Sequence, residues 1–155
     1  RRILKPVLDR GNHRKMFWLG KYRSVNNWCP WIISNLLTTA AFAECDTQLR
    51  EDIVQIGLDG LDEFLAAYQE EGSCDEGPNY WTVAGAALFN ALEVLWDLTG
   101  GRINIYDDPK VRNMFEFIAR TNIAGDYFFC FADSPVKLEL RCPWMLALPA
   151  AVWSM

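Results

Sequence analysis

One polar, turn-forming segment organises the chain: Gly72-Ser73-Cys74-Asp75-Glu76-Gly77-Pro78-Asn79-Tyr80-Trp81. Two long apolar helical patterns flank it, one ending near Tyr68 and the other beginning near Asn79. The segment places two carboxylates, an amide, a phenol and an indole where one helix ends and the next begins. Loops on a rigid helical scaffold often carry binding and catalytic groups. This segment is therefore the first candidate for chemistry.

The flanking patterns predict two helices. In the first, Asp46 is the cap, and apolar residues follow at helical spacing on two stripes. Two stripes predict contact on two sides. The second helix is expected to run from near Asn79 to Leu98 and to stop at Gly100-Gly101.

Similar signals predict helices along the rest of the chain. Asn26 or Asn27 is expected to cap a helix that reaches about Glu44, and Asp108-Pro109 to open another. Three further elements are predicted, namely the tail of a helix at 1–10, an extended segment at 127–131 and a last helix near Pro143. Because short connections place successive long helices antiparallel, we expect a single all-α domain spanning 1–155.

The composition predicts a packed interior. Hydrophobic residues make up 51% of the chain and charged residues 23%, which argues against disorder. The seven tryptophans indicate either a bulky core or an aromatic-lined cleft, and both interpretations stay open. The five cysteines have no pairing pattern and no nearby histidine, so we expect reduced thiols, no metal and no cofactor. Reduced thiols favour the cytoplasm, while a periplasmic or secreted protein stays open.

Charge is distributed unevenly along the chain. Residues 1–23 hold eight basic residues and one acidic residue, whereas the remainder holds seven basic and nineteen acidic residues. The basic block can attract an anion or form a solvated face. Nucleic-acid binding is not expected, because the sequence pI is about 4.9 and no recognised motif accompanies the block.

The chain is expected to be part of a larger protein. It begins with Arg1 and ends within the apolar run Leu146–Met155. No apolar stretch approaches the ~18 residues that a membrane span requires, so no membrane partner is expected. A helical array cut from its neighbours would expose apolar faces, which predicts self-association.

Three motifs together resemble the heparinase II/III-like polysaccharide lyases, over roughly residues 18–135: Asn26-Asn27-Trp28, then Glu76-Gly77-Pro78-Asn79-Tyr80-Trp81, then Phe131-Ala132-Asp133-Ser134. The resemblance implies an incomplete α/α-toroid, which is a curved array of antiparallel helical hairpins. In the family a β-sandwich domain normally follows. The implied activity is β-elimination on an acidic polysaccharide or oligosaccharide that contains uronic acid, by a carbon–oxygen lyase.

The resemblance implies a role for each matched residue. Tyr80 matches the family's catalytic tyrosine, which is the acid and sometimes also the base; packing under the loop is the alternative. Asn26 and Asn27 match an Asn-His pair that neutralises the uronate carboxylate and provides the base. The histidine is missing here, because the only histidine is His13. The resemblance implies that further histidines come from the following domain.

Candidate substrate-binding residues lie in these motifs or close to them, each with a structural alternative such as core packing or capping: Trp28, Trp31, Glu76, Asn79, Trp81 and Arg23. Positive charge from Arg14 or Arg23 would help the phenol to act as a base. Asp133-Ser134 is interpreted as a structural turn. Two rival functions stay open, namely a glycoside hydrolase on the same toroid using Asp75 or Glu76, and a non-catalytic helical module that binds glycan or protein.

Overall fold

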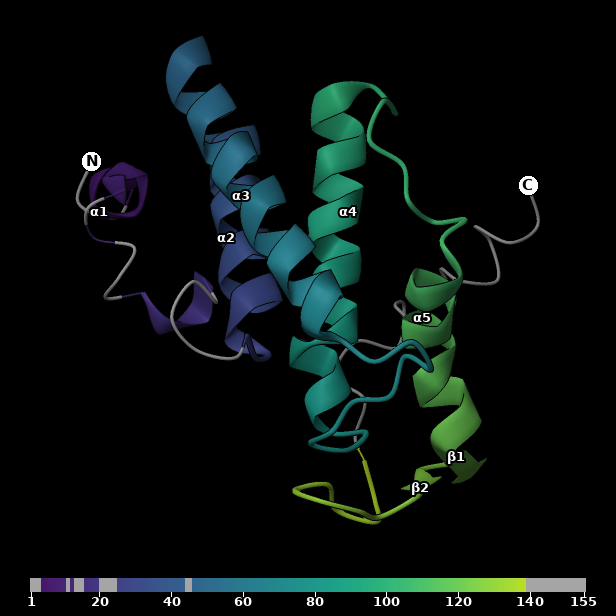
Figure 1. Ribbon diagram of the computed structural model, residues 1–155. Helices are drawn as coiled ribbons and strands as arrows, with labels where there is room; N and C mark the ends of the chain where they lie inside the picture. Colours follow the sequence, from purple (N-terminus) through teal and green to yellow (C-terminus); the bar gives the residue numbers. More distant parts are fainter. Residues whose placement is uncertain (1–3, 11, 13–15, 20–24, 44–45, 139–155) are drawn as a thin grey trace. The chain divides into compact units, whose positions relative to one another are not determined.

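The computed structural model of the protein describes residues 4–10, 12, 16–19, 25–43 and 46–138 (Figure 1). This part of the chain is mostly helical and contains five α-helices and one two-stranded hairpin. The all-α prediction is confirmed, whereas the toroid arrangement stays a prediction. The last helix expected near Pro143 lies outside the described residues.

The chain divides into two compact units, which we describe separately. Unit 1 comprises Arg1–Tyr68 and Ala87–Asn104, and unit 2 comprises Gln69–Ala86 and Ile105–Met155. Asn26 and Asn27 belong to unit 1, whereas Tyr80 belongs to unit 2.

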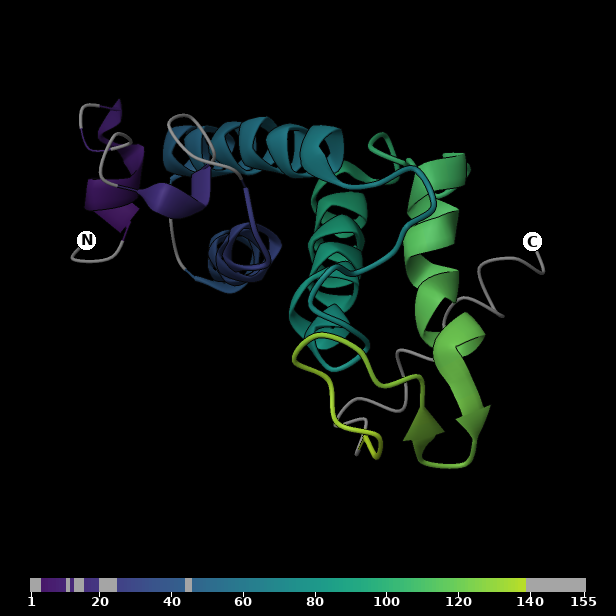
Figure 2. The same cartoon turned by 60° about the horizontal axis from the view of Figure 1, so that its bottom comes forward.

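Unit 1 is built around two antiparallel helices, α2 (Trp28–Phe42) and α3 (Thr47–Ala67), which lie side by side in Figures 1 and 2. The Cys29 thiol near the start of α2 donates to the Gly60 carbonyl near the end of α3, at 3.2 Å. At the opposite end, Nε of Arg50 donates to the Ala40 carbonyl at 3.1 Å. These two contacts establish the antiparallel direction that the short connection predicts.

The caps of unit 1 follow the sequence signals. The Asp46 carboxylate accepts a hydrogen bond from the Leu49 N–H at 2.8 Å, which confirms it as the cap of α3. At the start of α2 the N-cap residue is Asn27, whose side chain makes no capping hydrogen bond, and Oδ1 of the preceding Asn26 accepts the Trp28 N–H at 3.1 Å. The remaining elements of unit 1 are the short α1 (Leu4–Leu8) and the 3₁₀ turn η2 (Phe17–Leu19).

Helix α4 (Gly85–Thr99) begins later than the sequence pattern suggests. The expected start near Asn79 is wrong, because Tyr80–Val83 form a separate 3₁₀ turn, η3, and Ala84 leaves helical geometry (φ −113°, ψ −87°). The far end is as expected, since Gly100 and Gly101 adopt positive φ and the Gly101 N–H donates to the Trp96 carbonyl at 2.9 Å.

Unit 2 contains α5 (Pro109–Thr121) followed by a hairpin of β1 (Asn122–Ala124) and β2 (Tyr127–Phe128). The Asp108 cap and Pro109 start are confirmed, because the Asp108 carboxylate accepts from the Lys110 and Val111 N–H groups at 2.8 and 3.2 Å. The extended segment predicted over 127–131 is present but shorter, and its partner β1 was not predicted.

Apolar side chains of each unit form its interior. In unit 1 the buried side chains come from α2, α3 and α4, and they include Ile33, Leu37, Ile53, Phe64, Leu88 and Leu95. In unit 2 they come mainly from α5, and they include Val111, Met114, Phe115, Ile118 and Phe128. Within the described residues, no helix combines the length and apolar character that crossing a bilayer demands.

Candidate functional site

Contacts with α5 and with the segment after β2 hold the turn over residues 69–81 in place. The Asn113 side-chain amide donates to the Glu70 carbonyl at 2.9 Å, and Lys110 forms an ion pair with the Glu70 carboxylate at 2.8 Å. Within the turn, the Gly77 N–H donates to the Cys74 carbonyl and the Tyr80 N–H to the Gly77 carbonyl, at 2.9 and 3.1 Å. The turn is therefore bonded both internally and to its surroundings.

Two glycines allow the turn to approach its neighbours closely. Gly72 has φ +71°, and a Cβ there would lie 2.2 Å from the Asn113 backbone. Gly77 has φ +89°, and a Cβ there would lie 2.6 Å from the Phe131 carbonyl oxygen. Any other residue would meet both backbone strain and a steric clash. Glycine is thus required by the packing of the turn.

The second and third sequence motifs meet at this turn. The Asn79 N–H donates to the Ser134 hydroxyl oxygen at 3.0 Å, across 55 positions of sequence. Ser134 is buried, and its own carbonyl accepts from the Cys130 thiol at 3.1 Å. In Figure 2 the segment after β2 passes beside the turn. Asp133-Ser134 is predicted from the sequence as a structural turn, and the hydrogen bonds of Ser134 show how it holds this part of the chain.

Trp81 is an internal anchor of unit 2. Its side chain is 2% exposed, and its indole N–H donates to the Met114 carbonyl of α5 at 2.7 Å. Gly85 makes room for the ring, since a Cβ there would lie 2.4 Å from the indole nitrogen. The expectation that Trp81 stacks on a sugar is therefore corrected to anchoring, because its ring does not reach the surface.

Tyr80 lies beside this anchor with its side chain partly exposed. It is the first residue of η3, so the hydrogen bond of its N–H to Gly77 fixes its backbone. The neighbouring Trp81 ring is held in the interior. Tyr80 is thus a half-buried tyrosine on a constrained backbone, and a tyrosine side chain is one of the groups that can transfer a proton to a ligand.

Three carboxyl groups of unit 2 interact, namely Glu76 with Asp133 and with Asp75. Burial raises the pKa of the Glu76 carboxyl above its ordinary value, and the negative charges of Asp133 and Asp75 raise it further. From the sequence, Glu76 and Asp75 are predicted as candidate site residues, whereas Asp133 is assigned no chemical role. The motif Phe131–Ser134 contains Asp133, but the spacing of the motifs along the chain does not predict that this carboxylate acts on Glu76.

The predicted residues of unit 1 lie at the start of α2. Asn26 is exposed and Asn27 partly exposed, and the rings of Trp28 and Trp31 are 46% and 43% exposed. Asn79 of unit 2 is also exposed, so its amide is accessible to a ligand. Arg23, and likewise Arg14 and His13, lie outside the described residues.

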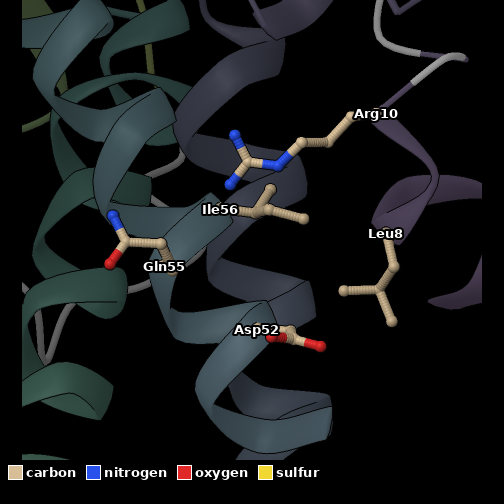
Figure 3. Close-up of a pocket in the computed structure, with 5 residues that line it drawn as sticks. All are labelled: Leu8, Arg10, Asp52, Gln55 and Ile56. Atoms are coloured by element: carbon tan, nitrogen blue, oxygen red, sulfur yellow. The ribbon is translucent and has the colours of Figure 1, made fainter. Parts of the chain in front are cut away.

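A small pocket of about 200 Å³ opens in unit 1 between the end of α1, with the residues just after it, and one face of α3 (Figure 3). Leu8 and Arg10 line one side, while Asp52, Gln55 and Ile56 come from α3. The Arg10 side chain extends toward Ile56 and Gln55. None of these residues belongs to the three motifs.

The thiols of the described residues show no metal site. No group of three or more histidine, cysteine, aspartate or glutamate side chains among the described residues could hold a metal ion. Cys29 and Cys74 are buried and Cys130 is exposed, all as free thiols. Burial raises the pKa of the Cys29 thiol to about 12, so it stays protonated and packs as a small apolar side chain.

Comparison with known proteins gives no assignment, because neither a family model nor a curated protein matches this sequence.

Proposed function

We propose that this chain is the helical part of a polysaccharide lyase that cleaves an acidic, uronate-containing polysaccharide by β-elimination. The three-motif resemblance supplies the reaction class. The observation that carries the proposal is the joining of two of these motifs through Asn79 and Ser134, beside a partly exposed Tyr80. The incomplete α/α-toroid is part of this proposal.

In the proposed reaction a proton leaves the carbon α to the uronate carboxylate, and the glycosidic oxygen departs from the β carbon. Tyr80 protonates that oxygen. A phenol O–H placed at the departing oxygen can act as the general acid. Acid–base assistance of this kind contributes on the order of 10²–10⁴-fold to the rate.

The carboxylate must also be neutralised, because its charge opposes removal of the α proton. Hydrogen-bond donors aimed at the developing enediolate are typically the largest catalytic contribution. The amides of Asn26 and Asn27 are the proposed donors. Both are at least partly exposed at the start of α2, so a ligand can reach them. Either Tyr80 takes the α proton itself and then passes it to the departing glycosidic oxygen, or a separate base outside the described residues takes that proton.

A second candidate function is favoured by Glu76. A hydrolase needs one carboxyl that keeps its proton and a second that is ionised. Burial together with Asp133 and Asp75 raises the pKa of Glu76, which suits the acid role. Asp133 or Asp75 would then be the second carboxyl group of the pair. This reaction adds water across the glycosidic bond and leaves no double bond.

The two reactions differ in their products, so one experiment separates them. The purified protein is incubated with alginate, heparan sulfate and chondroitin, and both ultraviolet absorbance and reducing ends are followed. Elimination yields a conjugated, absorbing uronate together with each new reducing end. Hydrolysis yields reducing ends without that absorbance. Reducing ends without absorbance would overturn the lyase proposal, as would the absence of both signals on all three substrates.

A further inference from the structure

Three aromatic rings gather on the surface of unit 1 at the start of α2. Phe17 of η2 meets Trp28 edge to face, with ring centroids 6.0 Å apart and planes at 72°. Trp28 meets Trp31 at 5.5 Å, with planes inclined by 34°. The three side chains, which we call the aromatic platform, are 49%, 46% and 43% exposed. Large rings packed on each other and still open to solvent form a candidate binding surface.

The described segments that carry the platform hold no charged residue. Residues 16–19 and 25–43 contain no Asp, Glu, Lys or Arg, so the whole of α2 is uncharged. A solvent-facing helix surface is normally rich in charged side chains. Here the exposed positions after Trp31 are Asn35, Thr38 and Thr39, which are amides and hydroxyls.

These polar side chains can meet hydroxyl groups of a ligand. The Asn35 amide nitrogen donates to the Trp31 carbonyl at 2.9 Å, and the Thr38 hydroxyl to the Ser34 carbonyl at 2.7 Å. The amide oxygen of Asn35 and the hydroxyl oxygen of Thr38 retain lone pairs that accept hydrogen bonds. The internal bonds hold both side chains in fixed positions beside the platform.

The size of the platform favours a small ligand over a folded protein. A fully buried aromatic side chain covers roughly 150–250 Å², so three rings, each less than half exposed, offer on the order of 300 Å². A stable protein interface needs about 800 Å² on each partner. A pyranose ring fits the smaller surface, because its apolar C–H face stacks on an indole while its hydroxyls meet amides.

We propose that the aromatic platform of Phe17, Trp28 and Trp31 is a saccharide-binding site that holds a sugar chain by stacking, independently of the proton transfer at Tyr80. The identity of the sugar rests on the proposed function, and the existence of the site does not. Because the side chains of the platform are uncharged, they contact the apolar face of the sugar ring, and other residues recognise its carboxylate.

The test measures binding by titration calorimetry in a Tyr80→Phe background, so that turnover does not consume the ligand. The probes are oligosaccharides of alginate, heparan sulfate and chondroitin, with a neutral glucan oligosaccharide for comparison. Trp28→Ala and Trp31→Ala should each weaken binding by about tenfold, as expected for loss of one stacked ring. Trp96→Ala is the matched control, because that indole is 41% exposed on α4 and outside the platform.

Folding of each variant is checked by circular dichroism, and Trp31→Phe provides a milder change that keeps a ring at that position. Trp31→Phe should bind with an affinity between those of the parent and Trp31→Ala. Equal affinity of the parent and of folded platform variants would overturn the proposal, as would an equal loss in Trp96→Ala. Failure of the parent to bind any of the four probes would overturn it too.

A second copy of the chain is the competing occupant, and sedimentation distinguishes it. If Trp28→Ala abolished a concentration-dependent dimer and left saccharide affinity unchanged, the platform would be a self-association surface and the proposal wrong. Platform-dependent binding without any unsaturated product would support this site while contradicting the lyase activity. If the platform variants bound saccharide as tightly as the parent and formed the unsaturated product at the same rate, the lyase activity would be supported and the platform site contradicted.

Discussion

The backbone N–H of Asn79 donates a hydrogen bond of 3.0 Å to the hydroxyl oxygen of Ser134. This bond joins the turn that carries Tyr80 to the segment that carries Asp133. Ser134 is 4% exposed, so the bond is shielded on the serine side. The arrangement brings two separate motifs into one local structure, and it makes the following predictions.

Ser134→Ala should lower the free energy of unfolding by about 1–2 kcal/mol, because the Asn79 N–H loses its partner in a partly buried position. Chemical denaturation measures the loss, and hydrogen exchange at the Asn79 amide should quicken. Ser73→Ala is the control on the same turn, where an exposed hydroxyl donates to Gln69; it should change stability by less than about 0.5 kcal/mol. Similar losses in the two variants would contradict the account.

Gly77→Ala should destabilise the protein strongly, by about 3–5 kcal/mol, since positive-φ strain and overpacking add. The new Cβ would lie 2.6 Å from the Phe131 carbonyl oxygen. Gly100→Ala provides the comparison, because Gly100 also has positive φ but a Cβ there meets nothing within 4 Å. It should lose only about 1–2 kcal/mol of strain. Equal losses would show that the contact with Phe131 is unimportant.

Trp81→Phe should cost about 2–4 kcal/mol, because it removes the hydrogen bond to the Met114 carbonyl and leaves a cavity over Gly85. Thermal unfolding measures the change. Trp96→Phe, at a 41% exposed indole, should have a much smaller effect. A Trp81→Phe variant as stable as the parent would refute the anchoring role that replaces the predicted sugar contact.

The pKa of the Glu76 carboxyl should lie above its ordinary value in a carbon-detected NMR titration. Asp133→Asn should lower this pKa, and Asp75→Asn should lower it less, because Asp133 contributes the larger charge effect. Asp107→Asn serves as the control, since Asp107 is paired with Arg112 and does not shift Glu76. An unchanged Glu76 pKa in Asp133→Asn would show that the charge of Asp133 does not act on Glu76.

The same pKa shift has a consequence for stability. The folded protein holds the Glu76 proton more tightly than the unfolded chain, so the free energy of unfolding falls as pH rises from below the ordinary pKa through the raised one. Glu76→Gln should remove this contribution. The variant should therefore gain stability relative to the parent as pH rises through that window, and a constant difference would contradict the sign.

Local signals in the sequence predicted the helices well. Asp46 and Asp108-Pro109 are caps whose bonds reach only two or three residues along the chain, so letters alone identify them. The start of α4 was mispredicted because a distant contact decides it. The indole N–H of Trp81 donates to the Met114 carbonyl, 33 positions away, and the chain forms η3 there instead of an α-helix.

The candidate site was predictable only in part. Tyr80 and Glu76 stand in one motif, and their place on a turn follows from the glycines and proline around them. The effect of Asp133 on Glu76 depends on how unit 2 packs, which no spacing rule predicts. The burial of Trp81 also depends on tertiary packing. A tryptophan at the start of a helical segment can be exposed, as Trp28 is, or internal, as Trp81 is.

In the proposed reaction Tyr80 delivers the proton to the departing glycosidic oxygen. The most direct measurement compares kcat for formation of the unsaturated uronate in the parent, Tyr80→Phe and Tyr127→Phe, the last being an exposed tyrosine of β2 in the same unit. The account predicts a loss of about 10²–10⁴-fold for Tyr80→Phe and an unchanged kcat for Tyr127→Phe. A Tyr80→Phe variant that eliminates at the parental rate would contradict it.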